Sequence, residues 1–302
     1  MNSWRKSTIA LLLLGLIAQA ASAEETLERI CGACVPRKIA SCGGFLEGIS
    51  VSPTGDLWAV NVLSGGVIKV LPDGHCREEA NTDGMPNGSK FLADGRLLIA
   101  DKERGLLIFD TQTKTFTPVT NSYGRENFRG LNDLYSDGSG GFYVTEPYGS
   151  DVLRPTGRVF HVTWDADKVS VRLFAENIAF PNGIAVSPDR QKVYVAEFAQ
   201  KRILALPSPF STVQNPLAVK FADVPGGNGP DGLATDAKGR LYVAGYGTGD
   251  VIVFDANAEF VGRIKLPEGA GKLVTNIAFK GQMMFVTEAQ NGEIWQIPFT
   301  NR

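Results

Sequence analysis

The stretch Phe180-Pro181-Asn182-Gly183-Ile184-Ala185-Val186-Ser187-Pro188-Asp189, followed by Val193-Tyr194-Val195-Ala196 and then Glu197, decides the fold of this chain. It predicts a turn that carries an amide side chain, a short strand, a polar hairpin turn and a second strand that ends on a carboxylate. The same phrase occurs five more times. Its six copies start at anchor residues that carry an amide or a carboxylate: Glu47, Asn87, Asn132, Asn182, Asp231 and Asn276.

The spacing of the anchors identifies the kind of repeat. Successive anchors are 40, 45, 50, 49 and 45 residues apart, which is the length of one four-stranded propeller blade. Short runs of Val, Ile, Tyr, Phe and Leu between Gly, Asp, Asn and Pro are typical of strands, and no helical periodicity is present. The sequence therefore predicts an all-β protein, a six-bladed β-propeller whose closure removes exposed sheet edges.

The last repeat is too short for a complete blade. From Asn276 to Phe299 there is room for about three strands. We therefore expect a strand from the N-terminal segment, residues 24–46, to complete the last blade. The domain prediction is a single propeller over residues 24–302.

The first 23 residues have the pattern of a secretory signal peptide. A basic start with Arg5 and Lys6 precedes an apolar run from Ile9 to Ile17, and Ala21-Ser22-Ala23 fits a cleavage site. The apolar run is shorter than the ~20 residues that span a bilayer. Removal of the two positive charges takes the formal net charge from −2 to −4, which argues against nucleic acid or an anionic membrane as partner. We predict an exported monomer, periplasmic or extracellular.

Four cysteines lie close together near the N-terminus: Cys31, Cys34, Cys42 and Cys76. In an oxidising compartment four cysteines typically form two disulfides, with three possible connectivities. A redox pair at Cys31 and Cys34, or a zinc site of four thiolates, are the alternatives. We expect the disulfides to pin the N-terminal segment onto the ring.

The anchors predict a cation site. The inner strands should bring them to one mouth of the ring, where Glu47, Asn132, Asn182 and Asp231 offer oxygen ligands with a combined charge of −2. This set favours Ca²⁺, with Mg²⁺ or Mn²⁺ as close alternatives. Zn²⁺ is a further alternative, although the set contains no imidazole or thiolate ligand. The competing interpretation is that Asn-Gly and Asp-Gly pairs only build turns. Glu47 argues against it, because Glu is a poor turn former.

A second ring of polar residues follows the second strands: Asn61, Asp101, Glu146, Glu197 and Glu288. For these we favour hydrogen bonds to hairpin amides over catalysis. The longest hairpin, from Pro147 to Gly157, is either a lid that sets specificity or an ordinary surface loop. The two histidines, His75 and His161, show no metal-ligand spacing.

The ordered set of motifs resembles the senescence-marker-protein/gluconolactonase/luciferin-regenerating-enzyme-like family over nearly the whole mature chain. The residues that carry the resemblance are Leu46-Glu47-Gly48, Leu131-Asn132-Asp133-Leu134, Phe180-Pro181-Asn182-Gly183, Gly229-Pro230-Asp231-Gly232 and Thr275-Asn276-Ile277-Ala278-Phe279. The chain is also similar to diisopropylfluorophosphatase and its lactonase relatives in Ala100-Asp101 and Phe285-Val286-Thr287-Glu288.

The resemblance implies a catalytic divalent cation on the axis of the propeller. It is held by the residues that match Glu47, Asn182 and Asp231, and Asn132 matches either a fourth ligand or a substrate contact. Members of the gluconolactonase type place an Arg two residues before that Asn, whereas Arg129 stands three before it. The N-terminal cysteines are not part of the family pattern.

We therefore predict metal-assisted hydrolysis of a lactone, with Asp231 as the catalytic residue, acting as general base or as nucleophile. The predicted substrate contacts are Asn132, Asn87, Asn276, Arg129, Glu146 and Tyr148. Two alternatives remain, a phosphotriesterase that uses the same ion and a propeller that binds a ligand without turning it over.

Overall fold

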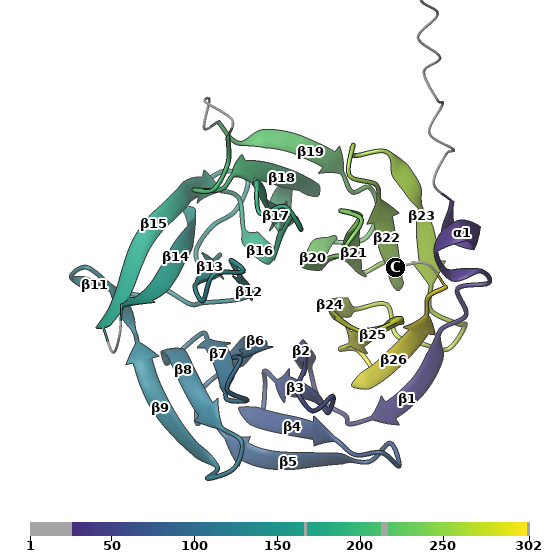
Figure 1. Cartoon of the computed structure of the whole chain (residues 1–302), viewed down its shortest axis with the longest axis horizontal. Coiled ribbons are helices and arrows are strands. Elements are labelled where there is room, and N and C mark those ends of the chain that lie inside the picture. Colours follow the sequence, from purple (N-terminus) through teal and green to yellow (C-terminus); the bar gives the residue numbers. More distant parts are fainter. Residues whose placement is uncertain (1–25, 166–167, 213–216, 301–302) are drawn as a thin grey trace, which may run out of the picture.

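Each blade is a sheet of four antiparallel strands, and its first strand lies nearest the common axis (Figure 1). The computed structural model describes residues 26–165, 168–212 and 217–300. Six such sheets form a closed ring, so the predicted six-bladed all-β propeller is confirmed. The predicted signal peptide lies outside the described residues.

Five blades use consecutive strands, which are named in order from the axis outward. The first is β2 (Leu46–Val51), β3 (Leu57–Asn61), β4 (Gly66–Val70) and β5 (Cys76–Asn81); the second is β6 (Pro86–Phe91), β7 (Leu97–Asp101), β8 (Gly105–Asp110) and β9 (Thr115–Thr120). The third is β12 (Leu134–Ser136), β13 (Phe142–Glu146), β14 (Gly157–Asp165) and β15 (Lys168–Ile178); the fourth is β16 (Pro181–Val186), β17 (Lys192–Glu197), β18 (Arg202–Pro207) and β19 (Val219–Asp223). The fifth is β20 (Gly229–Thr235), β21 (Leu241–Tyr246), β22 (Asp250–Phe254) and β23 (Phe260–Lys265). A small hairpin, β10 (Ser122–Tyr123) with β11 (Glu126–Asn127), follows the second blade.

The sixth blade joins the two ends of the described chain. It contains β24 (Val274–Lys280), β25 (Met283–Glu288), β26 (Glu293–Pro298) and, as its outermost strand, β1 (Arg37–Ser41). Lys38 pairs with Trp295 and Ser41 with Glu293. The N-terminal strand therefore completes the last blade, as predicted from the short final repeat.

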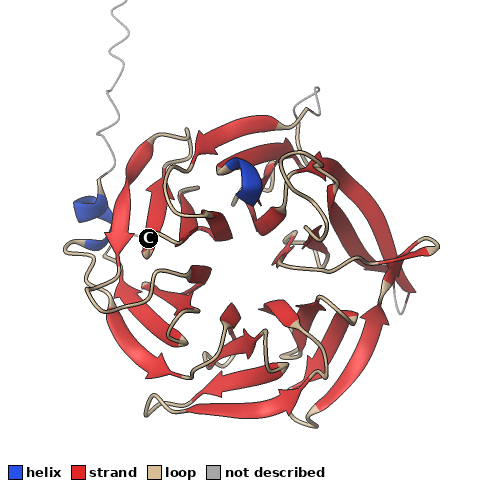
Figure 2. Ribbon diagram, turned by 180° about the vertical axis from the view of Figure 1, so that it is seen from behind, coloured by secondary structure: helices blue, strands red, loops and turns tan. Residues whose placement is uncertain are grey.

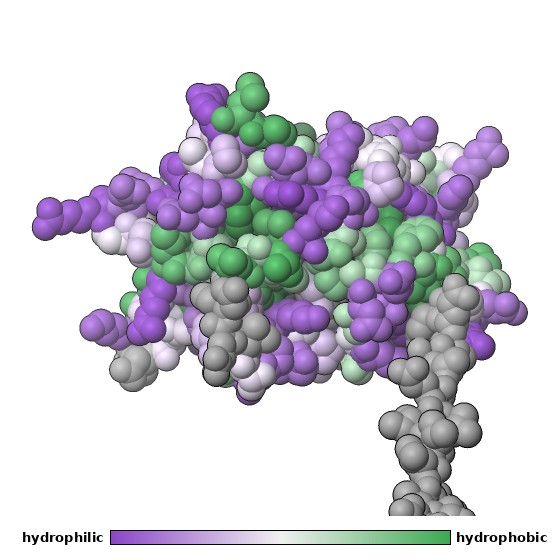
Figure 3. Space-filling view, turned by 90° about the horizontal axis from the view of Figure 1, so that it is seen from above, coloured by the Kyte–Doolittle hydropathy of each residue, from purple (hydrophilic) through white to green (hydrophobic). Residues whose placement is uncertain are grey.

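The core lies between neighbouring blades. Inner and second strands have blades packed on both faces, so strands such as β7 and β13 are buried along their whole length. Strands that are buried on both faces have continuous apolar runs rather than alternating patterns. Outer strands such as β5 are mostly accessible. Figure 3, a view onto the rim of the ring, shows apolar side chains gathered in a middle belt between more polar edges.

All four cysteines form disulfides, Cys31–Cys34 and Cys42–Cys76. The second disulfide joins the segment after β1 to the outermost strand of the first blade, as the pinning hypothesis requires. The first closes a local turn after α1 (Leu27–Cys31), which packs outside the ring on β23 (Figure 2). Within the described ranges, no helix has the length and apolar character needed to span a membrane.

Candidate metal and substrate site

Five of the six anchor residues each lie at the same kind of irregularity, a register shift in the inner strand of their own blade. The pairing between the first and second strands shifts register next to Glu47, Asn87, Asn182, Asp231 and Asn276. Such β-bulges bend a strand and re-aim its side chains. The sequence predicted a turn carrying the amide before each strand. That prediction is wrong in detail, because these anchors lie within strands and at bulges.

The glycines after the anchors allow adjacent inner strands to approach closely. A Cβ atom on Gly183 would lie 2.1 Å from the carbonyl oxygen of Asp231, and one on Gly232 would lie 2.6 Å from that of Thr275. Neither glycine has a positive φ, so neither is required by a turn. The turn interpretation of these Asn-Gly and Asp-Gly pairs is therefore wrong at both positions.

Two carboxylates from distant repeats interact at the face of the ring where the inner strands begin, which we call the anchor face. Glu47 and Asp231 are 4% and 3% exposed. Burial raises the pKa of Glu47 well above its usual value, and the negative charge of Asp231 raises it further. Burial and then the charge of Asp133 likewise raise the pKa of Asp231. A cation between these groups would relieve the repulsion.

Asp133 is a member of this cluster that the sequence analysis did not select. Its carboxylate is buried and accepts hydrogen bonds from the backbone N–H groups of Leu134 at 2.8 Å and Ile184 at 3.3 Å. The signal was present in the sequence, because Asp133 occupies the position that Gly183 and Gly232 hold after their own anchors.

Three side-chain oxygens of the anchors are buried without a hydrogen-bond partner among the described residues: Glu47 Oε2, Asn87 Oδ1 and Asn182 Oδ1. Leaving a buried polar atom unpaired is costly, so such atoms indicate a missing ligand. Neutral and charged oxygen donors together fit a hard divalent cation. No three Asp, Glu, His or Cys side chains of the described chain are grouped closely enough to hold a metal by themselves. The predicted set combines two carboxylates with two amides and does not need a third.

The remaining anchors differ in their surroundings. Asn276 is 2% exposed, and its side chain hydrogen-bonds to Glu47 and Asp133. This arrangement suits a residue that holds the carboxylates in place, whereas we predicted a substrate contact. Asn132 is only partly buried and lies before β12, where its backbone N–H donates to the Thr145 carbonyl oxygen at 2.9 Å.

Arg129 and Glu146, both predicted substrate contacts, bind each other. Glu146 is fully buried and accepts hydrogen bonds from the Arg129 backbone N–H at 2.6 Å and from its guanidinium at 3.1 and 3.2 Å. Arg158 donates to the same carboxylate at 2.6 Å. Glu146 therefore orients Arg129, whose side chain keeps 38% exposure. Tyr148 is 56% exposed on the neighbouring hairpin, and the Lys102 ammonium lies 5.5 Å from its ring centre.

The other residues at the ends of second strands accept hydrogen bonds from backbone amides, which is the interpretation we favoured. Asp101 accepts from Met85, Glu103 and Arg104 at 2.9–3.1 Å, and Glu288 accepts from Gln290 and Asn291 at 2.7 and 2.9 Å. Asn61 and Glu197 do the same for Phe45 and Ala179. His161 pairs with Asp137 and stacks on Tyr143, and His75 is exposed beside Asp73.

A group of aromatic rings stands beside the carboxylates. The Tyr246 ring lies 5.9 Å from Phe198 and 6.5 Å from Phe45, measured between ring centres, and Phe198 follows β17 in the short helix η1 (Phe198–Gln200) near the axis (Figure 2). Burial raises the pKa of the Tyr246 phenol, and the charges of Asp231 and Glu47 raise it further. The Tyr246 phenol therefore lies within electrostatic range of the carboxylate pair, although Tyr246 was not in the predicted set of site residues.

Known proteins share both the sequence motifs and the fold of this chain. The family model described as SMP-30/Gluconolactonase/LRE-like region matches residues 45–290. Lactonase drp35 of Staphylococcus epidermidis is 32% identical over 246 residues, which cover 76% of this chain and 72% of the relative. Regucalcin of Agrobacterium tumefaciens, a calcium-binding protein, superposes with a TM-score of 0.73 at 25% identity over 89% of this chain and 95% of its own. A gluconolactonase of Xanthomonas campestris gives 0.77 at 22% identity over 91% and 92%, a likeness that shows the fold alone.

Proposed function

Because the chain belongs to the SMP-30/Gluconolactonase/LRE-like family, we propose that it is a metal-dependent hydrolase that opens a sugar lactone or a related small lactone. The observation that carries this proposal is the convergence of Glu47, Asn182 and Asp231 from three different blades, together with buried oxygens of Glu47 and Asn182 that lack a hydrogen-bond partner in the described part of the chain. The name of the Staphylococcus epidermidis relative, a lactonase, supports the same reaction.

We propose that Glu47, Asn132, Asn182 and Asp231 hold the cation, with Ca²⁺ first among the candidates because all four offer oxygen atoms. The relation to regucalcin, a calcium-binding protein, supports this choice. When bound, the cation supplies positive charge that polarises the ester carbonyl and stabilises the negative charge that develops on its oxygen.

The protein's own groups supply the proton transfer and the positioning. In the proposed reaction Asp231 takes a proton from a water whose oxygen attacks the carbonyl carbon; the ring C–O bond then breaks and the leaving oxygen is protonated, giving a hydroxy acid. In the alternative, the Asp231 carboxylate attacks directly, and water later hydrolyses the resulting anhydride. The Arg129 guanidinium and the Asn132 amide orient the substrate, while Phe198 and Tyr246 exclude water.

We further propose that the protein is exported to the periplasm or the extracellular space. The two disulfides support this proposal, because disulfides persist mainly in oxidising compartments.

The test is hydrolysis of a panel of aldonolactones and aryl lactones. A pH indicator measures the acid that each reaction releases. In the Asp231→Asn variant we expect turnover to fall by roughly 10²-fold or more with the fold intact by circular dichroism. Asp223→Asn, at an exposed surface carboxylate, is the matched control and should keep full activity. EDTA should abolish activity and Ca²⁺ should restore it.

Unchanged hydrolysis in Asp231→Asn would remove the mechanism. A protein that binds Ca²⁺ stoichiometrically but releases no acid from any lactone would be a binding module instead. Cleavage of phosphotriesters in place of lactones would favour the phosphotriesterase alternative.

A further inference from the structure

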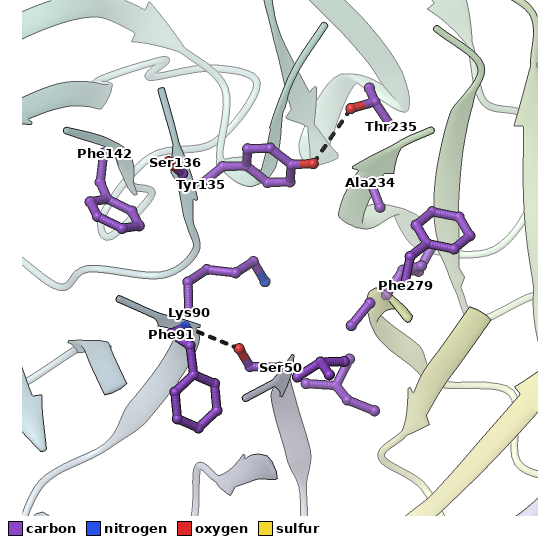
Figure 4. Close-up of a pocket in the computed structure, with 13 residues that line it drawn as sticks. Ser50, Lys90, Phe91, Tyr135, Ser136, Phe142, Ala234, Thr235 and Phe279 are labelled. Atoms are coloured by element: carbon purple, nitrogen blue, oxygen red, sulfur yellow. Dashed lines mark hydrogen bonds between the residues drawn. The ribbon is translucent and has the colours of Figure 1, made fainter. Parts of the chain in front are cut away.

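A cavity of about 310 Å³ opens at the end of the axis opposite the anchor face (Figure 4). Its wall is formed by the last residues of inner strands, among them Ser50 of β2, Lys90 of β6 and Thr235 of β20. Ser50 follows Glu47 by three residues, and Lys90 follows Asn87 by three. At ~3.3 Å per residue, at most about 10 Å along the strand separates the two levels, because the bulges at Glu47 and Asn87 shorten it. The cavity therefore opens at a different level of the axis from the candidate metal site, and none of the anchors lines it.

Lys90 is the one charged side chain among the described residues that line this cavity. It extends into the open space, and its ammonium group forms no hydrogen bond or ion pair with another part of the described chain (Figure 4). The negative charges that act on it, Asp133 and Glu47, belong to the cluster at the anchor face. Lys90 is partly buried, and a partly desolvated ammonium group without a direct partner is costly, so an anionic ligand would lower that cost.

Hydroxyl groups beside Lys90 can also donate. Ser50 Oγ accepts from the Phe91 backbone N–H at 3.2 Å, and Ser136 Oγ accepts from that of Gly138 at 3.1 Å, which leaves both hydroxyl protons available. The Thr235 hydroxyl, in contrast, donates to a backbone carbonyl oxygen at 2.7 Å. As far as the described residues form it, the wall of the cavity thus offers donors without a competing carboxylate.

The rest of the wall is apolar. Phe91 and Phe279 lie on opposite sides of the opening, and both rings are partly accessible (Figure 4). The volume is at the lower end of the ~300–1,000 Å³ range of small-molecule sites, so the ligand must be small. One ammonium group can neutralise one negative charge, so the site favours a monoanion over a dianion such as phosphate, which Glu47 and Asp133 would repel more strongly.

We propose that this cavity is a second binding site for a small organic carboxylate, whose charge pairs with Lys90 and whose aromatic or alkyl part lies against Phe91 and Phe279. The site is independent of the proposed hydrolase activity, and the test therefore uses metal-free protein in EDTA. The ligand would enter from the face opposite the anchors.

The experiment is isothermal titration of the mature chain with three probes of one shape: 3-phenylpropionate, 3-phenylpropan-1-ol and 3-phenylpropylamine. We expect saturable binding of the carboxylate and binding at least about tenfold weaker for the neutral and cationic probes, as loss of a charge-assisted hydrogen bond predicts. Inorganic phosphate should bind more weakly than the carboxylate.

Three variants locate the site. Lys90→Met should weaken carboxylate binding at least tenfold, whereas Lys238→Met, an exposed lysine in the hairpin between β20 and β21, should leave it unchanged. Ser136→Asp should also weaken binding, because it adds a carboxylate to the wall while Asp can still accept the Gly138 amide. Thermal unfolding checks that each variant is folded.

Equal affinity for the acid and the alcohol would overturn the proposal, as would carboxylate binding that survives in both Lys90→Met and Ser136→Asp. Loss of binding in Asp231→Asn with retention in Lys90→Met would place the carboxylate at the anchor face and would also overturn it. None of these outcomes depends on whether the protein hydrolyses lactones.

Discussion

At the residue scale, the close packing around the axis depends on glycines, which have no side chain, as much as on the residues that carry functional groups. Gly183 allows the backbone of the next inner strand to pass so close that a methyl group would meet the Asp231 carbonyl oxygen at 2.1 Å. Asn182 is the residue before Gly183, and Asp231 carries the carbonyl oxygen that Gly183 approaches. This contact therefore brings the side chains of both anchors to the same part of the axis. The glycine is thus part of the candidate site although it offers no ligand.

We expect Gly183→Ala to reduce the free energy of unfolding by about 2–4 kcal/mol, because the clash is with backbone and cannot be relieved by a side-chain rotation. It should also weaken Ca²⁺ binding measured by calorimetry. Gly149→Ala is the control, since its Cβ would meet nothing within 4 Å and only the positive φ of +74° opposes it, at about 1 kcal/mol. Equal losses in urea unfolding would contradict the packing argument.

At the element scale, the ring depends on β1, a strand of five residues that belongs by sequence to the start of the chain and by pairing to its end. Ala40 of β1 is buried in a cluster with Ile294 of the last blade and Leu46 of the first. The Cys42–Cys76 disulfide lies at the same junction and fastens the segment after β1 to β5. Strand and disulfide together close the ring.

The two disulfides should contribute unequally to stability. Cys42–Cys76 spans 34 residues, for which loop-closure entropy predicts about 3–4 kcal/mol, whereas Cys31–Cys34 spans 3 residues and predicts about 1.6 kcal/mol. Replacing Cys42 and Cys76 with Ser should therefore lower the thermal midpoint more than replacing Cys31 and Cys34. The comparison is made by calorimetry on the oxidised proteins, and a larger loss from the Cys31–Cys34 replacement would refute it.

At the scale of the whole molecule, charge is concentrated on the axis, where blades from all parts of the ring meet. Glu47 comes from the first blade, Asp133 from the segment leading into the third and Asp231 from the fifth. Burial raises the pKa of each of these carboxyl groups. Without a cation, the folded ring therefore holds negative charges that the unfolded chain would expose to water.

This predicts a pH dependence with a definite sign. Because Glu47 and Asp231 bind protons more tightly in the folded state, their contribution to the free energy of unfolding falls as pH rises from about 4 through the raised pKa values. In EDTA, the difference in thermal midpoint between wild type and Glu47→Gln should shift in favour of the variant between pH 4 and pH 8.

Saturating Ca²⁺ should remove this penalty in the wild type, adding about 2.7 kcal/mol at a hundredfold excess over Kd, and should stabilise Glu47→Gln less. Calorimetry at several pH values measures both effects. A difference between wild type and variant that does not change with pH would show that neither burial nor the neighbouring charge raises the pKa of Glu47 in the folded state.

The sequence by itself determined the number of blades, the strand content and the need for an N-terminal strand, because the repeat period and the apolar runs are local properties of the chain. It also identified anchors whose chemistry fits a cation. Only the tertiary structure decided which side chains meet, such as Glu146 with Arg129 and Asn276 with Glu47. It also brought Tyr246 within electrostatic range of Asp231 and placed Lys90 in the wall of a cavity at the other end of the axis. These partners come from different strands or blades, and their burial depends on how the blades pack, which no single stretch of sequence contains.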